Sequence, residues 1–244
     1  MKLFIVVSNF KKYEKNTTSI IKQLLKFFDI SLSKDDSMTL FKNVSYHLFD
    51  IKDADYVVSI GGDGTFLKAC RLSLIPQKRV IGIRVGRRGY LCSFDSKEII
   101  TKAKIEKLTF KKEITLKTKY GVAINDVIVG KDNFGGTIEL LLSIDGLEKY
   151  RFTGDGIIVS TPIGSSGYTS SAGGRIIRKG IIITPICAIN KHKPMVVSEN
   201  SKIVIKNINS NYKASVYLDG IKKDTIKNNI VISKNTKTIS VSIK

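Results

Sequence analysis

The sequence predicts an α/β N-terminal domain with a Rossmann-like parallel sheet, followed by an all-β sandwich domain. In the first part of the chain, apolar runs rich in β-branched residues alternate with amphipathic stretches, which is typical of a parallel sheet covered by helices. Further on, short strand-like segments follow one another with turn residues between them, which is typical of a sandwich. We therefore place a domain boundary near Asp95, which divides the chain into domains 1–95 and 96–244.

The first domain contains three apolar runs that read as buried parallel strands. These strands are expected at Lys2–Ser8, Tyr56–Ile60 and Arg79–Val85. Helical stripes are expected over Thr17–Phe28 and roughly over Thr65–Ser73, whereas Ser31–Asp53 is polar and ambiguous and fits a short strand and a helix. Ligands of such sheets bind at the carboxyl ends of the strands, which is where a glycine-rich turn follows Ile60.

The second domain follows an expected helix over Ser96–Leu108 and consists of short strands. These strands are expected at Thr109–Thr118, Val122–Gly130, Thr137–Ile144, Glu148–Phe152, Ile157–Ser160, Ile181–Thr184, Lys202–Ile208, Ala214–Leu218, Asn229–Ser233 and Thr238–Ile243. The pair Asp145-Gly146 lies between two of these runs and predicts a two-residue hairpin turn.

The composition, with 42% hydrophobic residues, indicates a folded chain with real cores. No apolar run approaches the ~18 residues of a membrane span. Leu3–Val7 is too short, and too soon followed by lysines, for a signal peptide, so we expect a cytoplasmic protein. The three cysteines, Cys70, Cys92 and Cys187, are widely spaced, which suggests neither a disulfide framework nor a structural zinc site.

The net charge of +20 comes from 41 Lys and Arg against 21 Asp and Glu. Such a charge favours polyanionic partners: nucleotides, polyphosphate or nucleic acid. The lysines are spread along the whole chain, however, and an ordinary solvated surface rich in lysine explains them as well.

The turn after Ile60 reads Gly61-Gly62-Asp63-Gly64-Thr65 and has the character of a phosphate site. Glycines let backbone N–H groups approach phosphate oxygens, and the N-terminus of the following helix favours negative charge. A carboxylate beside phosphate needs a reason, such as holding Mg²⁺ or taking a proton from an attacking hydroxyl. The alternative is that Asp63 merely caps the helix, as turn aspartates often do.

A second stretch rich in glycine and hydroxyl groups extends from Thr153 to Gly174. Its hydroxyls, one carboxylate and the ring of Tyr168 suit an uncharged polar ligand such as a nucleoside, although a polar loop that joins two sheets is an equal alternative. Gly-x-Ser-x-Gly is absent, and the chain has only His47 and His192 as candidate bases for a serine nucleophile. We expect His47 to be structural and His192 to be a solvated surface residue.

Several motifs together resemble the NAD kinase family. They are Gly-Gly-Asp-Gly-Thr-Phe-Leu at 61–67, Asn125-Asp126 before Val-Ile-Val, the run Gly-Asp-Gly-Ile-Ile-Val-Ser-Thr-Pro-Ile-Gly-Ser-Ser-Gly-Tyr at 154–168, Ser-Ala-Gly-Gly at 171–174 and Ile-Thr-Pro-Ile-Cys at 183–187. The first motif is shared with lipid kinases and more loosely with phosphofructokinases, whereas the long run at 154–168 is much more specific.

The resemblance implies transfer of a phosphoryl group from ATP, or from polyphosphate, to the 2′-hydroxyl of the adenosine ribose of NAD, with Mg²⁺ as cofactor and a homodimer or homotetramer as the assembly. Asp63 would be the general base, with Gly61, Gly62, Gly64 and Thr65 at the phosphates. The residues that would bind NAD are Asn125, Asp126, Thr153, Asp155, Ser166, Gly167, Tyr168, Thr169, Ser170 and Ser171.

The chain departs from the family pattern at three places. Arg84 stands where an Asn is usual, Ala188-Ile189 replaces a frequent Pro-His, and Ile221 replaces a Gln after Asp219-Gly220. Arg84 either helps a polyanionic donor or pairs with a surface acid, and we expect the second. Two alternative functions are a lipid kinase of the same superfamily, which would need a greasy pocket, and a non-catalytic nucleic-acid-binding protein, which would bind with a steep dependence on salt.

Overall fold

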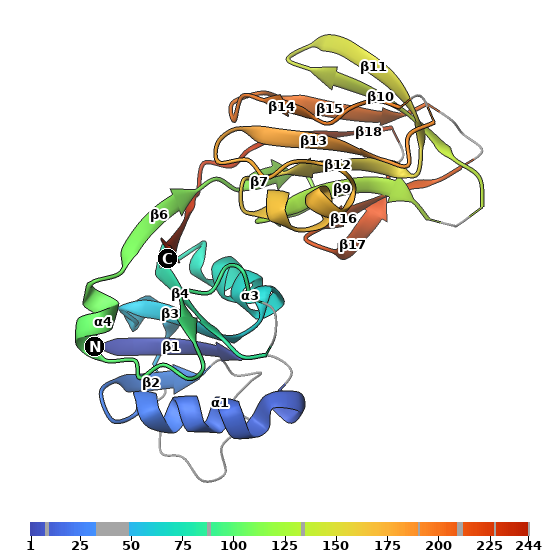
Figure 1. Ribbon diagram of the computed structural model, residues 1–244. Helices are drawn as coiled ribbons and strands as arrows, with labels where there is room; N and C mark the ends of the chain where they lie inside the picture. The colour runs from blue at the N-terminus through green and yellow to red at the C-terminus, as the bar shows by residue number, and fades with distance from the viewer. Residues whose placement is uncertain are drawn as a thin grey trace. The chain divides into compact units, whose positions relative to one another are not determined.

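A computed structural model of the chain describes residues 1–7, 10–32, 49–86, 89–132, 135–189, 191–208, 212–226 and 228–243, without the side chains of residues 10–12. Contacts divide the chain into two units. Unit 1 comprises Met1–Glu113 and Lys237–Lys244, and unit 2 comprises Ile114–Thr236. Unit 1 is an α/β structure and unit 2 is built from antiparallel strands, so the predicted fold class is confirmed (Figure 1).

The centre of unit 1 is a mostly parallel sheet. Its strands lie in the order β2 (Asp29–Leu32), β1 (Lys2–Val7), β3 (Tyr56–Gly61), β4 (Arg79–Arg84), β19 (Ile239–Ile243) and β6 (Thr109–Glu113), and β5 (Phe94–Asp95) pairs with β4. All neighbours are parallel except β6, which is antiparallel to β19. The parallel strands are buried apolar runs, as expected for strands that helices cover on both faces.

Among the described helices, α1 (Phe10–Leu24) runs alongside β2 and β1, and α3 (Asp63–Ser73) runs alongside β3 and β4 (Figure 1). Apolar residues of α1 pack against one face of the sheet in a single cluster with residues of β1, β3 and β4. On the other face, Gly82 of β4 leaves room for Phe66 of α3, since a Cβ at Gly82 would stand 2.9 Å from the Phe66 ring. The carboxyl ends of β1, β3 and β4 therefore meet at one edge between the helices.

The helices of unit 1 differ in extent from the prediction. α1 begins at Phe10 rather than near Thr17 and ends at Leu24, with a kink at Tyr13, where φ is −127°. The expected helix over 96–108 is reduced to α4 (Lys102–Glu106), which Thr101 caps through its side chain. A short 3₁₀ helix, η1 (Ile51–Asp53), precedes β3. The predictions for Ser8, His47 and most of 31–53 lie outside the described residues.

Unit 2 is a sandwich of two six-stranded antiparallel sheets. The first consists, in order, of β11 (Leu147–Gly154), β10 (Ile138–Ile144), β15 (Ile203–Asn207), β18 (Asn229–Lys234), β7 (Leu116–Thr118) and β8 (Gly121–Ala123). The second consists of β14 (Met195–Val197), β13 (Ile181–Ile186), β12 (Gly156–Ser160), β9 (Asp126–Lys131), β16 (Ala214–Leu218) and β17 (Ile221–Thr225). Both sheets contribute to one apolar core.

Turns and short helices connect these strands. Asp145 and Gly146 form the predicted hairpin between β10 and β11, with positive φ at both residues. After β12 the chain forms η2 (Gly164–Ser166) and α5 (Tyr168–Ser171) before it reaches β13. The second glycine-rich stretch therefore contains the end of β11, all of β12 and the compact, partly helical turn that follows β12.

The division into units does not coincide with the expected boundary near Asp95. Residues 96–113 and the C-terminal strand belong to unit 1, because β6 and β19 complete its sheet next to β4. The chain therefore passes from unit 1 to unit 2 after Glu113 and returns after Thr236.

Two observations concern the chain as a whole. Among the helices that the structure describes, none has the length and apolar character needed to cross a bilayer. All three cysteines are present as thiols, with Cys70 and Cys92 buried and Cys187 exposed.

Candidate functional site

In unit 1, the glycine-rich turn lies at the carboxyl edge of the parallel sheet. β3 ends at Gly61, Gly62 is the N-cap of α3, and Asp63 is the first helical residue. Within the described part of the chain, the backbone N–H groups of Asp63 and Gly64 have no hydrogen-bond partner. The first N–H groups of a helix are open to a ligand and carry the positive end of its dipole, so this turn can bind an anion.

The carboxylate of Asp63 is fixed from outside its own helix. Its two oxygens accept hydrogen bonds from the backbone N–H groups of Tyr90, at 3.3 Å, and Leu91, at 3.0 Å. No side chain caps α3, so the alternative of a capping Asp63 is wrong. An ionised carboxylate accepts about four hydrogen bonds, so Asp63 keeps acceptor capacity after these two.

The glycines of this turn serve different purposes. A Cβ at Gly61 would stand 2.2 Å from Oγ1 of Thr65, so Gly61 is required for packing and Thr65 is buried over it. A Cβ at Gly64 would meet nothing within 4 Å, and Gly64 is exposed. Packing therefore does not explain the glycine at 64, whereas close approach of a ligand to the backbone would.

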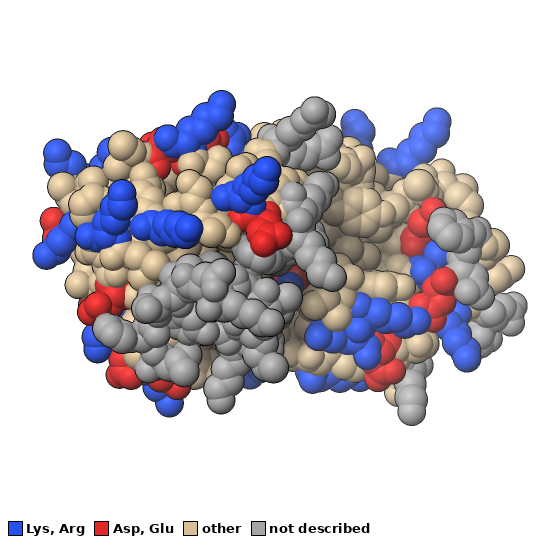
Figure 2. Space-filling model, turned by 90° about the horizontal axis from the view of Figure 1, so that it is seen from below, with Lys and Arg blue, Asp and Glu red and all other residues tan. Residues whose placement is uncertain are grey.

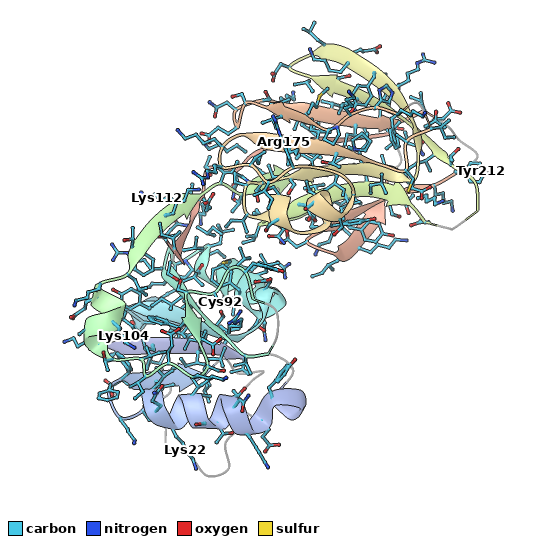
Figure 3. All side chains as sticks on the ribbon, in the orientation of Figure 1. Lys22, Cys92, Lys104, Lys112, Arg175 and Tyr212 are labelled. Carbon is cyan, nitrogen blue, oxygen red and sulfur yellow. The ribbon has the colours of Figure 1, made fainter. Side chains whose placement is uncertain are left out.

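Two side chains beside the turn are held by their neighbours. Arg84, at the end of β4, makes an ion pair with Asp95 at 2.6 Å, which confirms the expectation that it pairs with an acid. This bond raises the pKa of Arg84 and lowers the pKa of Asp95. Cys92, labelled in Figure 3, is 2% exposed, and its Sγ lies 3.9 Å from the carbonyl oxygen of Gly61.

In unit 2, Asn125 lies in the bend before β9, and Asp126 is the first residue of that strand. Asp126 is 5% exposed, and its burial, together with the charge of Asp219, raises its pKa to about 7. The carboxylate of Asp219 accepts hydrogen bonds from the backbone N–H groups of Ile124, Asn125 and Asp126. The sequence alone did not indicate a functional role for Asp219.

The chain after β12 packs directly on this turn. The carbonyl oxygen of Asn125 accepts hydrogen bonds from Thr161 N–H and Ser160 Oγ, and a Cβ at Gly164 would stand 2.2 Å from it. The side-chain oxygen Oδ1 of Asn125 is buried and has no partner in the described part of the chain. A buried amide oxygen without a donor is costly unless a ligand or water supplies one.

The remaining predicted residues on this side are mostly accessible. Ser166, Gly167, Tyr168, Ser170 and Ser171 are exposed, with the Tyr168 side chain 47% exposed. Thr169 is buried, and its hydroxyl lacks a partner among the described residues. Gly167 lies close to Asn125, because a Cβ at Gly167 would stand 4.0 Å from Asn125 Nδ2. The structure thus brings the Asn125 turn and the 166–171 segment together.

Thr153 and Asp155 lie elsewhere in unit 2. β12 pairs with β9 so that Ser160 is opposite Asp126 while Gly156 is opposite Gly130. Asp155 therefore lies at the other end of β12 from Ser160, about 16 Å away along the strand. Its carboxylate makes an ion pair with Lys131 at 2.7 Å.

His192 is partly exposed, and it also makes specific contacts with its neighbours. Its ring stacks on Tyr150, with centroids 4.0 Å apart, and its Nε2 lies 2.8 Å from the carbonyl oxygen of Arg151. Burial raises the pKa of the Tyr150 hydroxyl to about 12. These contacts hold His192 against β11.

Basic residues do not gather into one block among the described residues on the face shown in Figure 2. On the face shown in Figure 2, Lys and Arg side chains are spread over the molecule with Asp and Glu between them. An open groove of about 990 Å³ runs along α1 and is lined by several lysines, among them Lys15, Lys22, Lys26 and Lys97. The distribution fits a solvated lysine-rich surface better than a nucleic-acid footprint.

The fold and these turns define a class of protein: a nucleotide-binding protein with a glycine–aspartate loop on an α/β unit and a polar turn cluster on a β-sandwich unit. Two family models match the chain, the ATP-NAD kinase N-terminal domain over residues 6–108 and the ATP-NAD kinase C-terminal domain over residues 124–238. The chain belongs to the NAD kinase family.

Curated relatives agree with this assignment. The chain is 34% identical to an NAD kinase of Petrotoga mobilis over 180 residues, which is 68% of this chain and 65% of the relative. It is 32% identical to an NAD kinase of Campylobacter jejuni over 212 residues, 77% of this chain and 74% of the relative. The aligned part spans slightly less than two thirds of the P. mobilis protein and 62% of an NAD kinase of Natranaerobius thermophilus.

Solved structures share the fold. A yeast NADH kinase complexed with NADH superposes with a TM-score of 0.83 at 22% identity, covering 100% of this chain and 83% of that one. An NAD kinase of Archaeoglobus fulgidus in complex with ATP superposes with a TM-score of 0.76 at 27% identity, covering 99% of this chain and 93% of that one.

Proposed function

We propose that the chain transfers the terminal phosphoryl group of ATP, or of polyphosphate, to the 2′-hydroxyl of the adenosine ribose of NAD and so makes NADP. The observation that carries this proposal is Asp63, a fixed carboxylate beside two open N–H groups at the carboxyl edge of a parallel sheet. The names of the relatives support the same reaction and do not favour a lipid kinase or a nucleic-acid-binding protein.

The chemistry asks little of the protein beyond alignment and one base. Asp63 takes the proton of the 2′-hydroxyl while the hydroxyl oxygen forms a bond to the terminal phosphorus. At the same time, the bond from that phosphorus to the bridging oxygen of the donor breaks. The N–H groups of Asp63 and Gly64 bind phosphate oxygens. Asn125, Asp126 and the 166–171 segment bind the dinucleotide, whereas a part for Thr153 and Asp155 stays a prediction.

The proposal includes Mg²⁺, which we expect to arrive as the complex of the metal with ATP. No three metal-ligating side chains gather in the described part of the chain. Mg²⁺ usually keeps several waters and is held by one or two carboxylates together with substrate phosphates. The described residues are therefore compatible with a Mg²⁺ ion that is bound mainly by the phosphates of ATP. A homodimer or homotetramer and a cytoplasmic location also belong to the proposal, on the resemblance to the family.

Asp63→Asn tests the proposed base. Loss of a general base lowers turnover by about 10²–10⁴, so NADP formation from NAD and Mg²⁺ with ATP or polyphosphate should fall by that factor while NAD binding is largely kept. The matched control is Asp55→Asn, because the Asp55 carboxylate also accepts a backbone N–H, from Lys2 at 2.7 Å, but at the opposite end of β3. Turnover of the Asp63 variant within about tenfold of wild type would refute this assignment.

A further inference from the structure

Unit 2 contains two Asp-Gly hairpins with similar φ angles. Asp145-Gly146 joins β10 to β11 and Asp219-Gly220 joins β16 to β17. The φ angles are 53° and 84° in the first turn and 48° and 79° in the second. Aspartate and glycine tolerate such left-handed conformations, so turn chemistry accounts for both pairs. What distinguishes the two turns is the segment that each carboxylate binds.

The Asp145 carboxylate binds a segment outside the candidate site. It accepts hydrogen bonds from Lys202 N–H at 2.7 Å and Ser201 Oγ at 2.9 Å. These bonds tie the hairpin to the chain that leads into β15, and we assign them a structural role.

The Asp219 carboxylate binds the turn that carries Asn125. Its oxygens accept from Ile124 N–H at 3.0 Å, Asn125 N–H at 2.7 Å and Asp126 N–H at 3.2 Å. In return, the N–H of Asp219 donates to the carbonyl oxygen of Asp126 at 3.0 Å. Three successive N–H groups thus point at one carboxylate that lies more than ninety residues away in the chain.

These N–H groups have few other ways to be satisfied. Ile124 is fully buried and Asp126 is 5% exposed, so water has little access to the turn. Without the carboxylate, the turn would have to rearrange or leave buried donors unpaired, which is costly. A rearrangement would also move the 160–167 segment, because Gly164 packs against the carbonyl oxygen of Asn125.

Resting on the proposed function, we propose that Asp219 is the positioning residue of the dinucleotide-binding turn. Its carboxylate holds residues 124–126 so that Oδ1 of Asn125, which is buried and has no partner among the described residues, is kept available to a hydrogen-bond donor of NAD beside Gly167. Asp219 itself acts through the backbone, so it governs the binding of NAD rather than the transfer of the phosphoryl group.

The test compares Asp219→Gly with Asp145→Gly. Glycine keeps the left-handed turn and removes the carboxylate in both variants. Displacement of a substrate-positioning group costs about ten- to a hundredfold, so the Asp219 variant should raise KM for NAD by that factor with kcat within about threefold of wild type. The Asp145 variant should leave KM within about twofold. Asp219→Asn keeps one acceptor oxygen and should lie between wild type and glycine.

Hydrogen exchange of the backbone amides separates this inference from the proposed function. In the Asp219 variant, the amides of 124–126 should exchange faster, whereas in the Asp145 variant only the amide of Lys202 should. Equal KM values in the two glycine variants, or unchanged exchange at 124–126, overturn the inference.

If wild type makes no NADP, the proposed function fails, and the exchange result together with NAD binding still decides whether Asp219 positions the turn. If Asp219→Gly does not fold, Asp219→Asn against Asp145→Asn gives the same comparison.

Discussion

At the scale of single residues, Asp126 shows how burial beside a second carboxylate changes a titration. Burial and the charge of Asp219 raise its pKa to about 7, whereas in the unfolded chain it ionises near its usual value of 3.8. The native state therefore keeps a proton that the unfolded state releases. Stability falls as the pH rises from about 4 to about 7 and is constant above that range, as far as this group is concerned.

Asp126→Asn imitates the protonated acid and should remove this loss. Relative to wild type, the variant should be equally stable near pH 4 and more stable at pH 8 by up to about 4 kcal/mol, since each unit of pKa corresponds to about 1.4 kcal/mol. Denaturant unfolding at several pH values measures the difference. Asp145→Asn is the control with the opposite sign, because the Lys202 N–H lowers the pKa of Asp145 and its stabilisation is lost as the pH falls. An Asp126 variant that is less stable than wild type at pH 8 would contradict the account.

At the scale of elements, the turn between β3 and α3 combines packing and ligand binding in neighbouring glycines. Gly64→Ala has room and lies in the first turn of a helix, where alanine is favoured over glycine by about 0.5–1 kcal/mol. We expect an unchanged or higher Tm together with at least about tenfold lower NADP formation, because the new methyl group would block phosphate from the N–H groups.

Gly61→Ala serves as the comparison, and it should lower the Tm. Its Cβ would meet Oγ1 of Thr65 at 2.2 Å, and such overpacking costs about 1–3 kcal/mol. Thermal melts and initial rates on both variants distinguish the two roles. Full activity of the Gly64 variant would mean that the backbone does not approach phosphate closely.

At the scale of the whole molecule, local patterns predicted the elements better than their partners. The β1, β3 and β4 runs and the glycine turn could be read from the sequence, because periodicity and turn chemistry are local. The strand Thr238–Ile243 was also expected, but nothing local shows that it returns to pair with β4. For the same reason, the Asp-Gly pair at 219 was recognisable as a turn, whereas its bonds to 124–126 depend on a contact that only the folded chain makes.

The return of the C-terminal strand makes unit 1 depend on both ends of the chain. β19 lies between β4 and β6, with Ile239 2% exposed and Val241 5% exposed. A chain that stops after Thr236 leaves β6 without its partner and opens one edge of β4, so unit 1 should lose cooperative unfolding and become sensitive to protease.

Unit 2 contains both of its sheets between residues 114 and 236, so a fragment of that extent should resist digestion. Ile243→Ala, on the same strand but 41% exposed, should leave the Tm within about 2 °C of wild type. A truncated chain that melts like wild type would show that β19 adds nothing to the sheet, and the contacts of β4 and β6 would then need another source of stability.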